Sequence, residues 1–233
     1  MALSEIDFDH AEVMYQQINS ETIEDDYNIY RSINLAARDF CEKTELLTVT
    51  AQDIVITKES DVTFVATTPV DEFISPIRVS SVRIKNGENV DNYLIPRPLR
   101  EGFITSNSFR GFPCYFFPID RGEFQIFPLP NGDYTLHEIR MTAKPSPFDV
   151  TLQDRVFLPK VLSQQYSEVI MLKALEIIHS NPQSDIFDLS TAQYKRLEYN
   201  RKVSILKTKR DIAYNTGDLT MNAYSGDLGI YRN

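Results

Sequence analysis

The sequence predicts an α+β fold: N- and C-terminal helices pack together, an antiparallel β segment is inserted between them, and an extended C-terminal arm follows. Apolar residues recur at steps of three and four near the N-terminus and again over 154–215, as in helices with one buried face. From Leu46 the period falls to two, which is typical of strands. We therefore expect one domain of residues 1–233, with a helical part (1–45 and 154–215), a β insert (46–153) and an arm (216–233).

The first long helix is expected over residues 22–43. Thr22 is a good N-cap residue, and three acidic residues follow in the first turn, where the helix dipole favours negative charge. Apolar residues then recur at alternating steps of four and three as far as Phe40. Residues 1–19 carry a weaker amphipathic pattern, which indicates a short helix or an arm.

Strand-like stretches separated by turn residues make up the β insert. Their apolar and β-branched residues alternate with polar ones, which favours an antiparallel arrangement with short connections. The stretch 93–111 is rich in Pro, Arg, Gly and Ser, and it predicts an exposed loop. The expected strands are 47–50, 54–57, 62–65, 77–84, 114–117, 123–127 and 134–141.

A pair of helices is expected after the insert. Pro159 suits the first turn of a helix that runs to Ile178, because proline lacks the N–H that would be unpaired there. Asp188 is a good N-cap for a second helix that runs to about Asn215. That helix would be roughly 40 Å long, which exceeds what a small core needs. We expect its excess length to pack against something outside the chain.

Composition excludes several classes of protein. The chain has 233 residues and a net charge of −9, which argues against a general DNA-binding surface but allows DNA to slide past without being gripped. It contains no run of eighteen apolar residues, so we expect no membrane span, and its start lacks the pattern of a signal peptide. Cys41 and Cys114 are interpreted as two buried thiols, with a single disulfide as the alternative.

Motifs that carry catalysis are missing from the sequence. It has no P-loop, no GxGxxG and no GxSxG, and its three histidines do not neighbour Cys, Ser or Asp in the spacing of a triad or a zinc site. The cluster 181–188 resembles a calcium loop only faintly, because it lacks the glycine and the glutamate that such a loop requires. We therefore name no catalytic, cofactor-binding or metal-binding residue, and we expect a protein that is not an enzyme and needs no cofactor.

One charge pattern stands out in the last helix. Lys195, Lys202 and Lys209 recur every seven residues and therefore lie on one helix face, flanked by further basic residues. This stripe is interpreted first as a solvated basic face partly paired with Glu198 and Asp211. The second interpretation is a docking face for an acidic surface, such as another copy of this acidic chain or another ring. Contact with DNA phosphates comes third.

The arm after Asn215 has three glycines and no helical or strand period, yet it is richer in apolar residues than a merely solvating tail. We consider two structures for it: it becomes ordered on a partner, or it folds back on its own domain. In the first case six apolar side chains form the partner interface: Leu219, Met221, Tyr224, Leu228, Ile230 and Tyr231.

The order of these signals resembles the head-to-tail adaptor proteins of short-tailed bacteriophages, also called connector or tail-tubular A proteins. The stretch 36–44, AARDFCEKT, is similar to the end of the helix that precedes the insert in this group. The strand–Pro–turn–strand phrase 124–136, FQIFPLPNGDYTL, is similar to one common in such adaptors, and Leu158-Pro159 leads a helix in the same way. The Gly-, Asp- and Tyr-containing end, 215–231, resembles their C-terminal arm. The resemblance departs over 1–19, where the opening helix of many relatives is not recognisable.

This resemblance implies a structural virion protein of the neck, assembled in the host cytoplasm as a ring that is dodecameric in relatives. The ring would join the portal protein to the tail nozzle protein and form part of the channel through which DNA leaves without specific binding. Two rivals remain: another tail ring component, from the nozzle or baseplate, and a β-rich module that binds a carbohydrate or cell surface through 93–111. A hydrolase ranks third.

Overall fold

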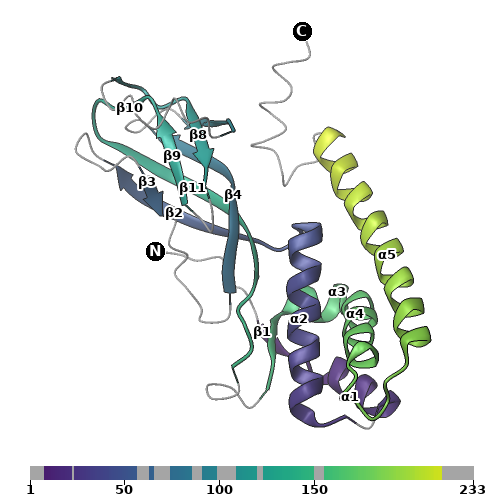
Figure 1. The fold of residues 1–233 in the computed structure, drawn as a ribbon. Coiled ribbons are helices and arrows are strands. Elements are labelled where there is room, and N and C mark those ends of the chain that lie inside the picture. The colour runs from purple at the N-terminus through teal and green to yellow at the C-terminus, as the bar shows by residue number, and fades with distance from the viewer. Residues whose placement is uncertain are drawn as a thin grey trace.

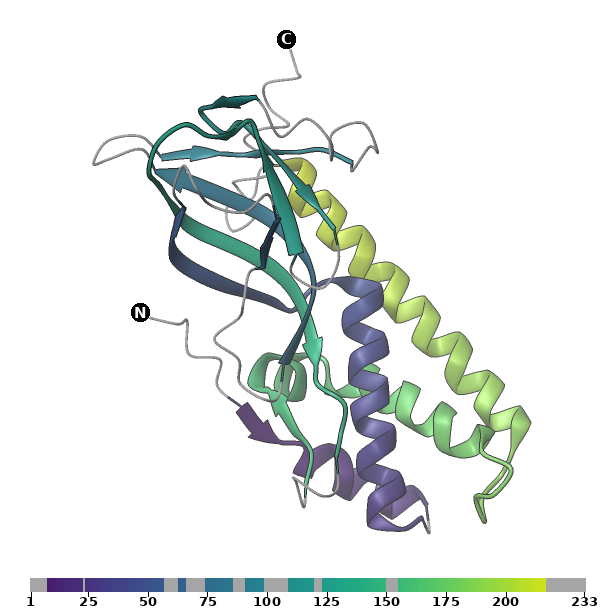
Figure 2. The ribbon, with the colours of Figure 1, turned by 60° about the vertical axis from the view of Figure 1, so that its left-hand side comes forward.

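Helices at one end of the molecule and β-sheets at the other make up the computed structural model (Figures 1 and 2). The helices that precede and follow the β insert pack together, so the predicted α+β fold is confirmed. The structure describes residues 8–22, 24–56, 63–65, 74–85, 91–98, 109–119, 123–149 and 155–216.

The N-terminal region holds two helices, α1 (Glu12–Glu21) and α2 (Asp26–Thr44), preceded by the short strand β1 (Phe8–His10). Of the two structures expected for residues 1–19, a short helix or an arm, the short helix is present as α1. The predicted start of the long helix at Thr22 is wrong. The Thr22 hydroxyl donates a hydrogen bond back to the Ile18 carbonyl at 2.8 Å, at the end of α1.

The true N-cap of α2 is Asp25, whose carboxylate accepts from the Asn28 N–H at 2.7 Å. Thr22 and Asp25, three positions apart, are both good capping residues. Asp25 caps α2 because Thr22 lies at the C-terminal end of α1. Glu45 follows the last turn of α2 with a φ of 53°, the left-handed conformation that often ends a helix.

The helix expected from Pro159 to Ile178 is divided in two. Pro159 ends the strand β12 (Phe157–Pro159), which pairs antiparallel with β1, and then come α3 (Lys160–Gln165) and α4 (Ser167–Ser180). The break is at Tyr166, which keeps its backbone hydrogen bonds to Leu162 and Ile170 and lies with its ring 5.0 Å from that of Phe40. The chain therefore bends without leaving those backbone groups unpaired.

The last helix, α5 (Leu189–Thr216), agrees with the sequence prediction. Asp188 caps its N-terminus: one carboxylate oxygen accepts from the Ser190 N–H at 2.9 Å, and the other accepts from the Thr191 hydroxyl at 2.6 Å. These hydrogen bonds, above all the one from the Thr191 side chain, hold the pKa of Asp188 below its usual range.

Asp188→Ala should lower the melting temperature at pH 7, because the first turn of α5 loses its cap. A lowered carboxyl pKa stabilises the fold above the ordinary pKa, and this contribution disappears as the pH falls through the folded-state pKa. The difference between wild type and Asp188→Ala should therefore shrink in acid. Asp188→Asn is the control, since it keeps an acceptor without titrating. Thermal melts at pH 7 and in acid measure both effects, and equal melting of wild type and Asp188→Ala at pH 7 would contradict the prediction.

Two four-stranded sheets pack against each other in the β part (Figure 1). The first sheet has the order β2-β11-β4-β5, is antiparallel throughout, and carries the two longest strands. The second has the order β3-β9-β8-β6. The strands are β2 (Thr48–Ile56), β3 (Thr63–Val65), β4 (Ile74–Lys85), β5 (Asp91–Tyr93), β6 (Ile95–Pro96), β7 (Arg110–Gly111), β8 (Tyr115–Pro118), β9 (Glu123–Phe127), β10 (Leu129–Pro130) and β11 (Tyr134–Pro145).

Three details of the β prediction need correction. The stretches expected as two strands over 47–50 and 54–57 form the single strand β2. The expected loop 93–111 includes β6 and β7, and its part 99–108 lies outside the described residues. The pairs β6–β8 and β7–β10 are parallel, each over two residues, so the described strands of the insert are antiparallel except for these short contacts.

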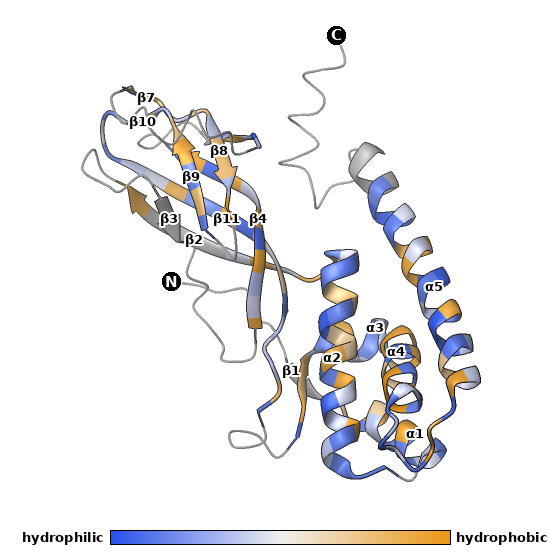
Figure 3. Ribbon diagram, in the orientation of Figure 1, coloured by the Kyte–Doolittle hydropathy of each residue, from blue (hydrophilic) through white to orange (hydrophobic). Residues whose placement is uncertain are grey.

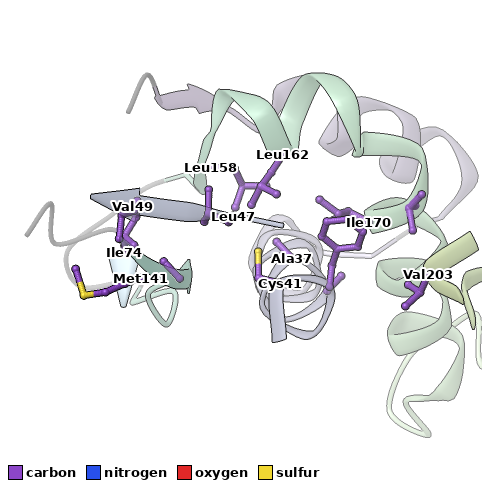
Figure 4. Packing of buried hydrophobic residues seen from close by; sticks show 14 of the residues in the cluster. Ala37, Cys41, Leu47, Val49, Ile74, Met141, Leu158, Leu162, Ile170 and Val203 are labelled. Atoms are coloured by element: carbon purple, nitrogen blue, oxygen red, sulfur yellow. The ribbon is translucent and has the colours of Figure 1, made fainter. Parts of the chain in front are cut away.

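One apolar core runs from the first sheet across α2 to α4 and α5 (Figure 4). Cys41 lies in the middle of it and is fully buried, and burial raises the pKa of its thiol well above the usual range. Cys114 is exposed, so the expectation of two buried thiols is right for Cys41 and wrong for Cys114. Both thiols are free, and the alternative of a disulfide is wrong as well.

Candidate interaction surface on the C-terminal helix

The inner side of α5 packs on α4 and, more lightly, on α2. Ala192, Tyr199 and Val203 are buried there, at the spacing of one helix face, and Leu206 packs against the same core. The prediction that the helices before and after the insert pack together is confirmed by these contacts.

Tyr199 fixes the position of α5 along the bundle. Its ring lies beneath two cations, with the Lys43 Nζ 5.1 Å and the Lys173 Nζ 5.7 Å from the ring centroid. Its hydroxyl donates to Asp39 Oδ2 at 2.7 Å, and the Lys43 ammonium bonds the same oxygen at 2.8 Å. Burial, followed by the hydrogen bond to Asp39, raises the pKa of Tyr199, so its phenol stays neutral at physiological pH.

Arg210 binds the far half of α5 to the junction between the helices and the sheets. Its guanidinium donates to the Thr44 carbonyl at 2.7 Å and to Glu45 Oε2 at 3.2 Å. The same Glu45 oxygen accepts from Arg78 of β4 at 2.6 Å. One carboxylate therefore connects the end of α2, the first sheet and α5.

The opposite side of α5 leaves large apolar side chains in solvent. Tyr194, Leu197 and Ile205 are 59%, 70% and 47% exposed, and their spacing places them on one face of the helix together with Arg201. We call these three residues the outer stripe. α5 accordingly mixes hydrophobic and hydrophilic residues along its coloured length (Figure 3).

Sequence reasoning did not single out the outer stripe, although it did expect an overlong helix with an external partner. The available signal is that apolar residues of this helix occur on two sides, whereas a surface helix normally has one apolar face. Three scattered exposed apolar residues would need no explanation, but three on one face of one helix form a patch.

Lys195, Lys202 and Lys209 lie in different environments in the structure. Lys195 and Lys202 are half-buried at the edge of the inner side, where Lys195 Nζ lies 3.7 Å from Glu21 and Lys202 pairs with Glu168. These partners come from α1 and α4. The expected pairing with Asp211 is found at the flanking Arg210, at 2.9 Å, whereas Glu198 accepts a hydrogen bond from Tyr194. Lys209 is exposed. Lys195 and Lys202 therefore also help to hold α5 against α1 and α4 of the same chain.

Charge is distributed unevenly over the molecule. Between Leu189 and Thr216 the sequence has seven Lys and Arg residues against two Asp and Glu residues, whereas the whole chain carries a net charge of −9. The rest of the chain is therefore more acidic than the total suggests. A basic helix on an acidic protein favours contact with a partner of the same composition, including a second copy.

The six expected interface residues of the arm, from Leu219 to Tyr231, lie outside the described residues. Within the part of the chain that the structure describes, no three His, Cys, Asp or Glu side chains gather closely enough to hold a metal ion. No helix in that part is both long and apolar enough to cross a bilayer.

Comparison with known protein families identifies a match over most of the chain. The model of the family described as SU10 adaptor protein matches residues 9–221, which extends from β1 to beyond the end of α5. No curated protein matches the sequence.

Proposed function

The chain belongs to the SU10 adaptor protein family, a family of phage structural adaptors, and we propose that it joins the portal ring to the tail as one copy in a ring around the DNA channel. The match covers most of the chain and agrees with the resemblance seen in the sequence, and the family is structural rather than catalytic. The proposed partners are the portal protein, the tail nozzle protein and further copies of the chain, twelve in a ring by analogy with related adaptors.

The outer stripe is the observation that carries this proposal. Tyr194, Leu197 and Ile205 would each become more stable out of water, by roughly 25 cal/mol for every Å² of apolar surface that a partner covers. In an isolated chain these three side chains of the 28-residue helix stay in water, and this stabilisation is not gained. A protein whose function is to be held between neighbours requires such surfaces, because the fully buried core of an interface is apolar and rich in aromatic residues.

The net negative charge of the chain is compatible with a place in the wall of a DNA channel. A net charge of −9 repels phosphates, and a wall that binds few phosphates releases few counterions, so DNA passing along it is not retained. The basic residues of α5 act in protein contacts in this proposal, since Lys195, Lys202 and Arg210 already pair with carboxylates of the same chain.

The arm is proposed to attach the ring to its partner, because its apolar residues follow the end of the last helix. Deleting 218–233 should leave the fold intact and abolish attachment. The test is to supply the truncated protein during phage assembly and to measure its abundance, the tails and the DNA in purified particles. Thr220→Ala with Ser225→Ala is the control, since it changes the arm but keeps its apolar side chains. Truncated protein found in tailed particles that retain DNA would contradict the proposal.

A further inference from the structure

A second exposed face is found on α2. Tyr27 and Leu35 are 45% and 42% exposed, Arg31 between them is exposed, and the side chain of Glu42 is 48% exposed although it bonds Lys144. Steps of four, four and seven place these four residues on one side of the helix. We call this set the α2 outer face. It combines apolar and charged residues, as the outer stripe and its neighbours do on α5.

The two faces cannot meet within one chain. α2 and α5 both pack on α4, and each carries its exposed residues on the side away from its buried ones. Both helices also run in the same direction, from the end of the bundle that is remote from the sheets toward the sheets (Figures 1 and 2). A neighbouring copy rotated about an axis along the bundle would keep that direction, because such a rotation does not reverse a helix.

In a parallel arrangement the charges on the two faces are complementary. Fifteen residues separate Tyr27 from Glu42, and fifteen separate Tyr194 from Lys209, so both pairs span about 22 Å of helix. When the two tyrosines are level, Arg31 lies level with Glu198 and Glu42 lies level with Lys209. Both are pairs of opposite charge at the edge of an apolar contact. Leu35 then lies level with Lys202, between the levels of Leu197 and Ile205.

An antiparallel arrangement is less favourable. If Leu35 is placed level with Leu197 and Tyr27 level with Ile205, so that the apolar residues match, Arg31 meets Arg201 in the middle of the contact. Like charges placed opposite each other in an interface weaken association. Of these two registers, the charges favour the parallel one, which is also the one that a ring about an axis along the bundle can repeat.

We propose that the outer stripe of α5 in one copy packs in parallel against the α2 outer face of the next copy. This inference rests on the proposed ring and specifies which surfaces close it. The contact is head-to-tail, because the two copies contribute different surfaces, and head-to-tail contacts generate rings when the rotation closes. Arg31 and Glu198 form one ion pair across it, and Glu42 and Lys209 form the other.

Cross-linking tests the contact in the full-length protein. Cys114→Ser removes the exposed thiol, and Cys41 is fully buried, where the reagent does not reach it. In that background, assembled particles that carry Arg31→Cys together with Glu198→Cys should give a ladder of covalent multimers with a short bis-maleimide. Glu198→Cys alone should give none. Dimers from that single variant would instead mean that two α5 helices face each other, which would overturn the proposal.

Charge exchange tests the same contact without cysteines. Arg31→Glu alone and Glu198→Arg alone should each weaken association between copies by roughly tenfold or more, because each places like charges together. The double exchange should restore association, and circular dichroism verifies that each variant is folded. Native mass spectrometry or light scattering measures the assembly.

The outcomes separate this inference from the proposed function. If the Cys114→Ser protein is present in particles but neither cross-linking nor charge rescue occurs, the contact is wrong and the adaptor function stands. If the Cys114→Ser protein is absent from particles and does not associate, the ring itself is wrong, and the inference falls with it.

Discussion

Tyr199→Ala should destabilise the folded chain by about 3–5 kcal/mol, within the range for removing a buried aromatic side chain. Three interactions are lost together: the apolar contacts of the ring, its contacts with two lysines, and the hydrogen bond to Asp39. Lys43 and Asp39 keep their own bond, so no charge is left without a partner. We expect α5 to lose its fixed position before the rest of the bundle unfolds.

Denaturant unfolding and amide hydrogen exchange measure these two effects. The free energy of unfolding gives the size of the destabilisation, and exchange rates along α5 report whether the helix is released locally. Tyr194→Ala is a matched control, because it removes the same side chain from the same helix at a position that is 59% exposed. Tyr194→Ala should lower the free energy of unfolding by no more than about 0.5 kcal/mol. Equal costs at Tyr199 and Tyr194 would show that Tyr199 does not fix the helix.

Phe124→Ala should have a comparable effect on the β part, about 3–5 kcal/mol. Phe124 is fully buried on the second sheet, beside Phe116 and Ile126, and this sheet packs on the first through contacts of β4 with β8 and β9. Removing its ring leaves a cavity that the strands on both sides cannot close completely.

The helices should melt at a lower temperature in the same variant. The core is continuous from Phe124 through the first sheet to α2, so the two parts are expected to unfold together. Circular dichroism at a helical wavelength measures this. Phe109→Ala is the control, because Phe109 is 59% exposed and stacks on Phe127 at the surface. Helices that melt unchanged in Phe124→Ala would show that the β insert unfolds as a separate unit.

Local chemistry explains which elements were predictable. α5 was predicted to within about a residue because Asp188 is a strong cap and the helical period continues from it without interruption. The start of α2 was misplaced because Thr22 and Asp25 both suit an N-cap, and only the packing of α1 decides between them. The break at Tyr166 was missed since the residues on either side of it keep the same apolar period.

The candidate site was predictable only in part. The length of α5 follows from its own sequence, and so does the proposal that its excess length packs against a partner outside the chain. The contact between Tyr199 and Asp39 joins residues 160 positions apart, and no local pattern predicts it. The lysine pattern was visible, but that Lys195 and Lys202 pair with Glu21 and Glu168 depends on how α1 and α4 pack. Which apolar residues of α5 stay exposed depends on the same packing.

Glu45 has a mechanical consequence for the molecule as a whole. Its carboxylate is shared by Arg78 of the sheet and Arg210 of α5, and it stands directly after the last turn of α2. A tilt of the sheets against the bundle would stretch both contacts and draw α5 along. Glu45 thus joins the two ends of the protein, and we expect a displacement of the strands to be transmitted to the helix that bears the outer stripe.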